Sequence, residues 1–288
     1  MISIEEIHKK IGSVYEMILF PYILLAMPFA FMGAILAIRG LPSLNQILWI
    51  AVAMFGARNG GMVLNRLIDM KIDAQNPRTQ DRILPRGELS KTTALVLALF
   101  FLALFIYSAY KLNPLCFVIS PFVIILLIIY SFLKRYTWFV HFFLGIIQSM
   151  APIGAWIAVK GEFSITAFLV GLGVLFWTAG FDIIDKCPDV EFDKNFGLHS
   201  IPQWLGVKQA LFFSHLFHLI FVFIFIIVYY IYNLGFLFLS GVLIAGIILS
   251  YGHYLISQED LSKVDAVVFY ANISVSIIML VFTFLDVA

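Results

Sequence analysis

The chain has 288 residues, of which 62% are hydrophobic and only 12% are charged, and its formal net charge is +1. A soluble domain carries about twice that charged fraction, so the composition excludes an ordinary water-soluble globular protein. The apolar residues come in long runs rather than in amphipathic stripes, which predicts that most of the chain lies in lipid.

Long apolar runs follow one another along the whole chain. A hydrocarbon core of about 30 Å needs about 20 apolar residues for each helical crossing. We expect nine spanning helices, at about residues 16–38, 46–64, 92–112, 114–132, 138–159, 164–181, 208–231, 235–254 and 267–285. A membrane β-barrel would show short alternating segments instead, and the unbroken apolar stretch 221–231 excludes it. The sequence therefore predicts an all-α, polytopic membrane protein with a single domain over residues 1–288.

The basic residues are distributed unevenly between the two sides of this predicted bundle. If residue 1 lies in the cytoplasm, nearly all lysines and arginines fall in inner loops, and the outer loops carry only Arg39, Lys111 and Lys160. The positive-inside rule then places the amino terminus in the cytoplasm and the carboxyl terminus outside. We expect a location in a bacterial inner membrane, with membrane lipid as a partner and neither a nucleic acid nor an obligate protein partner.

Two predicted loops on the cytoplasmic side, at about 65–91 and 182–207, are long and rich in charge. Each begins with polar residues spaced by four, and the two sets are offset by 120 residues: Asn65, Asp69 and Asp73 in the first, Asp185, Asp189 and Asp193 in the second. Residues four apart lie on one helix face, where like charges repel. Pro188 interrupts the second set, so it cannot form one regular helix, and Asp185 is expected to point elsewhere.

A stripe of carboxylates without matching lysines is typical of a cation site. Magnesium prefers one or two carboxylates together with phosphate oxygens and water. The two stripes facing each other therefore predict Mg²⁺ ions that bridge to one diphosphate. Arginine binds phosphate through two parallel N–H groups, and lysine contributes a point charge. Basic residues of this kind lie close by in the inner loops: Arg78, Arg82, Arg86, Lys134 and Arg135.

Two charged residues stand nearer to the spans. Asp182 and Arg58 lie at the edge of a span and inside one, where ionisable groups are costly and usually functional. Asp182 and Asp185 are the candidates for a catalytic base. His215 and His218 favour a packing role, and His141 and His253 carry no functional signal.

These segments resemble the motifs of a known family, the UbiA prenyltransferase superfamily. Its first motif is matched by Asn65 to Asp73 with Asn76-Pro77-Arg78-Thr79 and Leu84-Pro85-Arg86-Gly87, its second by Asp189 to Asp193 with Gly197-Leu198-His199-Ser200-Ile201-Pro202, and a third by Tyr130 to Thr137. The motifs occur in the expected order over the whole chain. The sequence departs from the pattern at Arg66, where several members have Asp, and at Asp185 to Pro188, where a stretch beginning with Tyr is more usual.

The resemblance implies nine helices around a central cavity, capped by the two cytoplasmic loops. It implies transfer of a polyprenyl group from a polyprenyl diphosphate to an aromatic acceptor, with Mg²⁺ as cofactor. By motif position, the metal–diphosphate would be held by Asn65, Asp69, Asp73, Asp189 and Asp193, with help from Arg78, Lys134 and Arg135, and Arg58 would lie near the acceptor.

The branch most similar to this sequence contains the 4-hydroxybenzoate polyprenyltransferases of ubiquinone and menaquinone synthesis. Three alternatives stay open at this point. Near relatives prenylate 1,4-dihydroxy-6-naphthoate in a menaquinone pathway, other members of the superfamily use a haem or a chlorin as acceptor, and a protein of another class, a membrane transporter, would also place charged residues near its spans.

Overall fold

The computed structural model describes residues 12, 16–17 and 23–287, and all regular secondary structure among them is helical. The long helices are α2 (Ile23–Ile38), α3 (Leu44–Asp73), α4 (Lys91–Leu112), α5 (Pro114–Leu133), α6 (Val140–Lys160), α7 (Ile165–Lys186), α10 (Val207–Ile231), α11 (Phe236–Tyr254) and α12 (Val264–Val287). Three short elements, η2 (Cys187–Asp189), α8 (Val190–Phe196) and α9 (Ile201–Leu205), connect α7 to α10.

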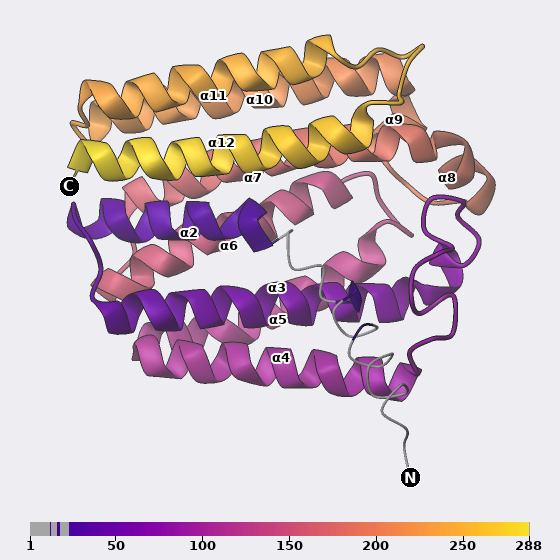
Figure 1. Ribbon diagram of the computed structural model, residues 1–288, viewed down its shortest axis with the longest axis horizontal. Helices are drawn as coiled ribbons and strands as arrows, with labels where there is room; N and C mark the ends of the chain where they lie inside the picture. The colour runs from indigo at the N-terminus through magenta and orange to yellow at the C-terminus, as the bar shows by residue number, and fades with distance from the viewer. Residues whose placement is uncertain (1–11, 13–15, 18–22, 288) are drawn as a thin grey trace.

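The long helices lie side by side in one bundle (Figure 1). Helices α10, α11 and α12 stand with α7 on one side, α3, α4 and α5 stand on the other, and α2 and α6 lie between the two groups. Helices adjacent in sequence mostly pack as neighbours, across the short connections and across the two long ones, 74–90 and 187–206, alike.

Eight of the described helices are long and apolar enough to cross a membrane. The predicted all-α, polytopic membrane fold is thereby confirmed. The remaining predicted span, the first in the chain at 16–38, corresponds to α2, which is shorter and begins at Ile23. Residues 18–22 of that prediction lie outside the described residues. The number nine therefore stays a prediction.

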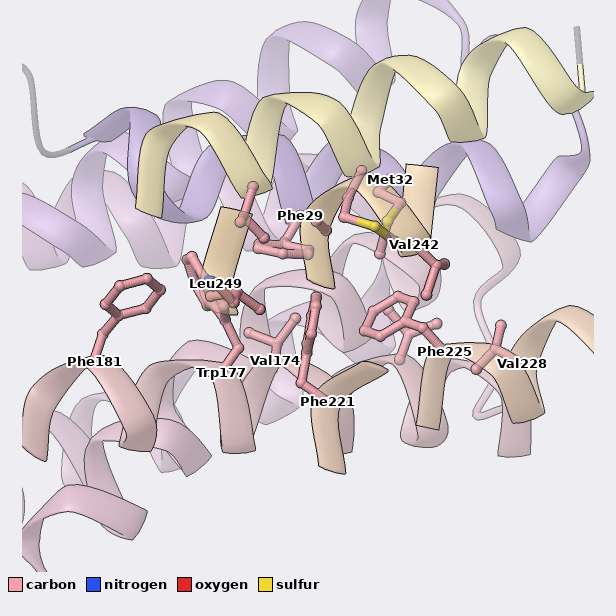
Figure 2. Packing of buried hydrophobic residues seen from close by; sticks show 14 of the residues in the cluster. Phe29, Met32, Val174, Trp177, Phe181, Phe221, Phe225, Val228, Val242 and Leu249 are labelled. Atoms are coloured by element: carbon pink, nitrogen blue, oxygen red, sulfur yellow. The ribbon is translucent and has the colours of Figure 1, made fainter. Parts of the chain in front are cut away.

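The half of the bundle built from α2, α7, α10, α11 and α12 is closely packed. Figure 2 shows side chains of these helices converging on one apolar cluster. The ring centroids of Phe29 and Trp177 are 4.7 Å apart in an edge-to-face arrangement, and those of Phe221 and Phe225 are 4.8 Å apart. Such aromatic pairs add to the dispersion energy of a bundle in which lipid supplies no hydrophobic drive between helices.

Helix α3 extends well beyond the thickness of a bilayer core. Its 30 residues make it about 45 Å long at 1.5 Å per residue. Ser43 and Gln46 form a capping box at its first turn, and Gly56 and Gly60, spaced as in a small-residue packing motif, lie against α4. The last turns of α3 therefore carry its polar residues past the apolar part of the bundle, as the spacing by four predicts.

The second acidic stretch is not one helix, because Pro188 ends α7. The chain passes through the short 3₁₀ turn η2 and restarts as α8, which ends at Gly197 in the left-handed conformation. Asp185 thus belongs to α7, Asp189 to η2 and Asp193 to α8. The predicted break in this stripe is confirmed, because its three acids belong to three different elements.

Candidate active site

The ends of α3, α5 and α7 meet the loops 74–90, 134–139 and 187–206 at one end of the bundle, called here the polar end (Figure 1). The two acidic stretches, far apart in the sequence, are joined there by direct contacts. Asn76 donates from Nδ2 to Asp189 Oδ1 at 3.4 Å, and Arg78 Nη1 lies 3.1 Å from Asp189 Oδ2. The predicted association of the two loops at a common site is therefore present in the structure.

Asp69 is the most densely contacted acid of the first stretch. Its carboxylate lies 2.8 Å from Lys134 Nζ and 2.8 Å from Arg135 Nη2, and Asn65 Nδ2 donates to it at 3.1 Å. Arg135 also donates to the carbonyl of Ile68 at 3.2 Å. The motif after α5 is thus fastened to the end of α3, and four of the residues expected to hold the metal–diphosphate lie within one hydrogen-bonded group.

The remaining acids of the two stretches also have basic partners. Arg82 Nη1 lies 2.9 Å from Asp73 Oδ2, and Lys186 Nζ lies 3.1 Å from Asp189 Oδ2. Lys186 belongs to the part of the sequence that departs from the family pattern, and it supplies a cation directly beside the second motif.

Arg78 is the link between three separate segments. In addition to Asp189 it contacts Asp185 at 3.3 Å and Asp265, in the first turn of α12, at 2.8 Å. Burial lowers the pKa of Arg78, but the three carboxylates outweigh burial and raise that pKa above its ordinary value. The guanidinium is therefore charged at every accessible pH and holds the loop after α3 against α7 and α12.

Three consecutive residues after α8 close the site from the other side. The backbone N–H of His199 donates to the carbonyl of Lys134 at 2.7 Å, and Ser200 Oγ donates to Asp193 Oδ2 at 2.9 Å. The backbone N–H of Ile201 donates to His141 Nε2 at 3.1 Å. This short stretch, which also caps α9 through Ser200, connects the second acidic segment to the loop after α5 and to α6.

The acids of this site are buried, whereas the bases beside them are partly exposed. The side chains of Asp69 and Asp189 are 2% and 3% exposed, compared with 27% for Lys134 and 28% for Arg78. Burial lowers the pKa of Lys134, although the attraction of Asp69 opposes this. An added anion would therefore favour the charged lysine and would find flexible cations already at the surface of the site.

The donor set fits magnesium bound together with a phosphate group. Asn65, Asp69, Asp73, Asp189 and Asp193 offer hard oxygen ligands from two facing segments, which is the chemistry that Mg²⁺ prefers. Within the part of the chain that the structure describes, no three His, Cys, Asp or Glu side chains converge as a metal cage. A site of this kind uses one or two carboxylates per ion and takes its other ligands from phosphate and water.

An apolar cavity of about 280 Å³ lies between α2, α3, α4, α5 and α6. Its polar lining is confined to a few side chains, among them Arg58, Tyr130 and Gln148 toward the polar end. Cys116 and Phe163 line it toward the opposite end. The sequence predicted a central cavity; the space observed is on one side of the bundle, because the other half is filled by the aromatic cluster of α2, α7 and α10.

Tyr130 relates this cavity to the charged site. The carboxylates of Asp182 and Asp69 and the guanidinium of Arg58 are close enough to act electrostatically on the Tyr130 hydroxyl. The apolar space therefore ends next to acids and bases. A long apolar chain with an anionic head would find an environment for each part.

The two candidate bases have different surroundings. Asp185 is 35% exposed and holds Arg78 and Lys186, whose Nζ lies 3.7 Å from it. Asp182 is 13% exposed and accepts from His141 Nδ1 at 2.7 Å. Asp185 does not point elsewhere, as Pro188 had led us to expect, because it contacts the same Arg78 and Lys186 as Asp189. Asp182 instead has the buried His141 as its partner.

The predicted site residues thus occupy two connected places. Around the ion pairs of the polar end lie Asn65, Asp69, Asp73, Arg78, Lys134, Arg135, Asp185, Asp189 and Asp193, while Arg58 lines the cavity and Asp182 lies near it. The sequence analysis missed the contacts of Lys186 and Arg82 and the buried His141. Lys186 and Arg82 were discoverable as cations within the motifs, but a single histidine in an apolar run carries no such signal.

Comparison with known proteins decides the family. The model of the UbiA prenyltransferase family matches residues 26–273, most of the chain. The chain belongs to the UbiA prenyltransferase family. The apo structure of a UbiA homologue from Aeropyrum pernix K1 is 31% identical and superimposes with a TM-score of 0.82 over 90% of this chain and 95% of that one.

Relatives of known name are also similar to this UbiA-family chain. The 4-hydroxybenzoate octaprenyltransferase of Vibrio campbellii is 33% identical over 180 residues, which are 62% of this chain and 62% of that protein. The protein of the same name from Vibrio atlanticus is 30% identical over 78% of this chain and 79% of its own length. The match to the first of these thus spans less than two thirds of its length. A UbiA homologue from Archaeoglobus fulgidus bound to GPP and Mg²⁺, 19% identical with a TM-score of 0.75 over 95% of this chain and 98% of that one, shares the fold.

Proposed function

We propose that this protein transfers a polyprenyl group from a polyprenyl diphosphate to the aromatic ring of 4-hydroxybenzoate, with Mg²⁺ as cofactor, in quinone biosynthesis. The observation that carries the proposal is the placement of buried acids and partly exposed bases at the end of the bundle toward which Arg58 and Tyr130 line an apolar cavity. Such a site suits a molecule with an anionic diphosphate head and a long apolar tail.

The relatives support the same substrates. Proteins named 4-hydroxybenzoate octaprenyltransferase are similar to this chain over most of its length. A more distant protein of the same fold has been solved with GPP and Mg²⁺ bound. Names and ligands of relatives support the reaction class more strongly than the acceptor or the length of the prenyl chain.

The residues of the polar end would receive the diphosphate head. Asn65, Asp69, Asp73, Asp189 and Asp193 would hold magnesium, which, when bound, neutralises charge on the departing diphosphate. Arg78, Lys134 and Arg135 would turn from their carboxylate partners to the phosphate oxygens, because their exposed side chains can move whereas the buried acids cannot. Negative charge that develops as the allylic C–O bond breaks is then met by preorganised cations.

The cavity would carry out the second half of the reaction. Its apolar lining excludes water from the allylic cation, and Tyr130 beside it offers an aromatic face to a positive charge. Arg58, which lines the cavity toward the polar end, would hold the acceptor carboxylate. The ring carbon ortho to the phenol then bonds to the allylic carbon, and Asp182 accepts the proton that this ring carbon releases.

The orientation in the membrane is part of the proposal. The polar end carries most of the basic residues, so the positive-inside rule places it in the cytoplasm, where soluble aromatic acids and diphosphates are made. The amino terminus and the active-site loops would be cytoplasmic and the carboxyl terminus outside, in a bacterial inner membrane.

The assay that tests the function uses membranes containing the protein, Mg²⁺ and a long-chain polyprenyl diphosphate. 4-Hydroxybenzoate and 1,4-dihydroxy-6-naphthoate are supplied in separate reactions, and membranes without the protein are the control. We expect a prenylated product from 4-hydroxybenzoate alone. Product only from the naphthoate would move the protein to a menaquinone pathway that uses that acceptor. Product from neither, with folded protein, would contradict the proposal and favour another acceptor such as a haem or chlorin first and transport second.

A further inference from the structure

His141 is a fully buried polar side chain whose two ring nitrogens both have partners. It lies in the first turn of α6 and is 0% exposed. Nδ1 lies 2.7 Å from Asp182 Oδ2 on α7, and Nε2 lies 3.1 Å from the backbone nitrogen of Ile201 on α9. One imidazole thus connects the beginning of α6, the end of α7 and the segment that follows the second acidic motif.

The partners determine where the ring proton lies. The backbone N–H of Ile201 can only donate, so Nε2 must accept with its lone pair. In the neutral ring the hydrogen is then on Nδ1, from which it is donated to Asp182 Oδ2. A donor on one carboxylate oxygen favours the ionised acid and limits its rotation, and the other oxygen is left for another partner.

The environment of Asp182 makes that second oxygen useful. The groups that face this carboxylate are His141 from α6, Tyr130 from α5 and Lys186 one turn later on α7. Tyr130 also lines the apolar cavity, so Asp182 lies near the end of the cavity that is closest to the polar end of the bundle. Asp182 is therefore a carboxylate with one oxygen held by His141, near the place where the acceptor ring would be.

We propose that His141 is a positioning residue: its Nδ1–H holds Asp182 in the orientation that accepts the ring proton, while its Nε2 fastens that arrangement to the Ile201 backbone. The inference rests on the proposed function, because it deepens the role given to Asp182 there. It adds that the orientation of the base depends on the segment His199 to Ile201, which also contacts Lys134 and Asp193. The same segment therefore contacts residues of the diphosphate site and the histidine that orients the base.

Two substitutions separate the donor from the bulk of the ring. His141→Asn keeps an N–H near the position of Nδ1, and His141→Leu fills similar space without a donor. We expect kcat of the Leu variant to fall about 100-fold, because a small misplacement of a catalytic group costs about that factor. The KM for the diphosphate should change little, and the Asn variant should recover most of the lost rate.

The pH profile distinguishes positioning from packing. Loss of the donor disfavours the ionised carboxylate, so the acidic limb of kcat against pH should move to higher pH in His141→Leu and much less in His141→Asn. The matched control is His218→Leu, which removes another buried histidine, one that contacts His253 and Trp177 instead. That variant should lose thermal stability and keep the limb in place. Equal loss in both His141 variants with an unmoved limb, or a normal rate in His141→Leu, would overturn the proposal.

A measurement without substrate covers the case in which the variants do not fold or the reaction is a different one. In ¹⁵N-histidine-labelled protein, the ring signals of His141 are those that are missing from whichever His141 variant folds. If neither folds, they are assigned as the signals that shift in Asp182→Asn. We expect a neutral Nδ1–H tautomer, perturbed by Asp182→Asn. An Nε2–H tautomer would overturn the dyad. Absence of product from unsubstituted protein with the expected tautomer present would reject the proposed function and retain the contact.

Discussion

At the scale of single residues, the candidate site combines buried acids with partly exposed bases. The side chains of Asp69 and Asp189 are almost completely buried, and each is contacted by more than one cationic or amide group. A buried carboxylate without such partners would be strongly destabilising, and these pairs offset part of that cost.

The two acids carry the first prediction. Asp69→Asn and Asp189→Asn should each lower the rate of prenyl transfer about 100-fold or more, because several kcal/mol of charge stabilisation in the transition state are lost. Initial rates with saturating diphosphate measure the effect. Asp81→Asn, which changes an exposed acid of the same loop as Arg78, is the control and should react normally. Near-normal turnover in both site variants would show that the metal–diphosphate assignment is wrong.

At the scale of elements, the site depends on how closely the helices that carry it approach each other. A carbon added at Gly56 of α3 would lie 2.8 Å from the Phe101 carbonyl oxygen and 2.8 Å from the Phe105 nitrogen, both backbone atoms of α4. A backbone atom cannot turn aside as a flexible side chain does, so α3 and α4 would have to separate. At Gly60 of the same helix, an added carbon would first meet the flexible side chain of Leu102.

Gly56→Ala should therefore destabilise the protein by about 1–3 kcal/mol, the usual cost of overpacking. The midpoint of unfolding in a mixed-micelle denaturant titration measures this. Gly154→Ala is the matched control, since an added carbon there meets nothing within 4 Å and alanine is the better helix former. Equal midpoints for the two variants would mean that α3 and α4 do not require this contact.

At the scale of the whole molecule, the two halves of the bundle have different roles. The half around Phe221 and Trp177 is filled with aromatic side chains and gives α7 a fixed position. The other half contains the cavity, and the loops of the polar end close over both. The acids and bases of the site contact one another directly. A metal ion alone would therefore have to displace bases from the acids, and a diphosphate alone would have to displace acids from the bases.

This charge pairing predicts that Mg²⁺ and diphosphate bind together. Mg²⁺ alone and a polyprenyl diphosphate alone should each raise the melting temperature little, whereas the two together should raise it clearly. A ligand at about 100 times its Kd stabilises by about 2.7 kcal/mol. Thermal unfolding with each component, with both, and with both plus EDTA measures the coupling. A full shift from Mg²⁺ alone would contradict the picture of acids already satisfied by bases.

The sequence by itself determined the class of the molecule and most members of the site. Long apolar runs require membrane helices. Carboxylates spaced by four directly after such a run predict that the helix continues beyond the bilayer with a polar face. Pro188 alone was sufficient to predict that Asp185, Asp189 and Asp193 do not belong to one regular helix. These features depend on residues that are close together in the chain, so the spacing of apolar and charged residues in the sequence is enough to predict them.

Only the tertiary structure decided the contacts between segments distant in the chain. Arg78 meets Asp265 across 187 residues, and His141 meets Asp182 across 41 and Ile201 across 60. The position of the cavity also depended on which half of the bundle the aromatic side chains fill. Helix packing angles and loop closures set these relations, and a one-dimensional pattern does not contain them because many arrangements of the same helices bury the same apolar surface.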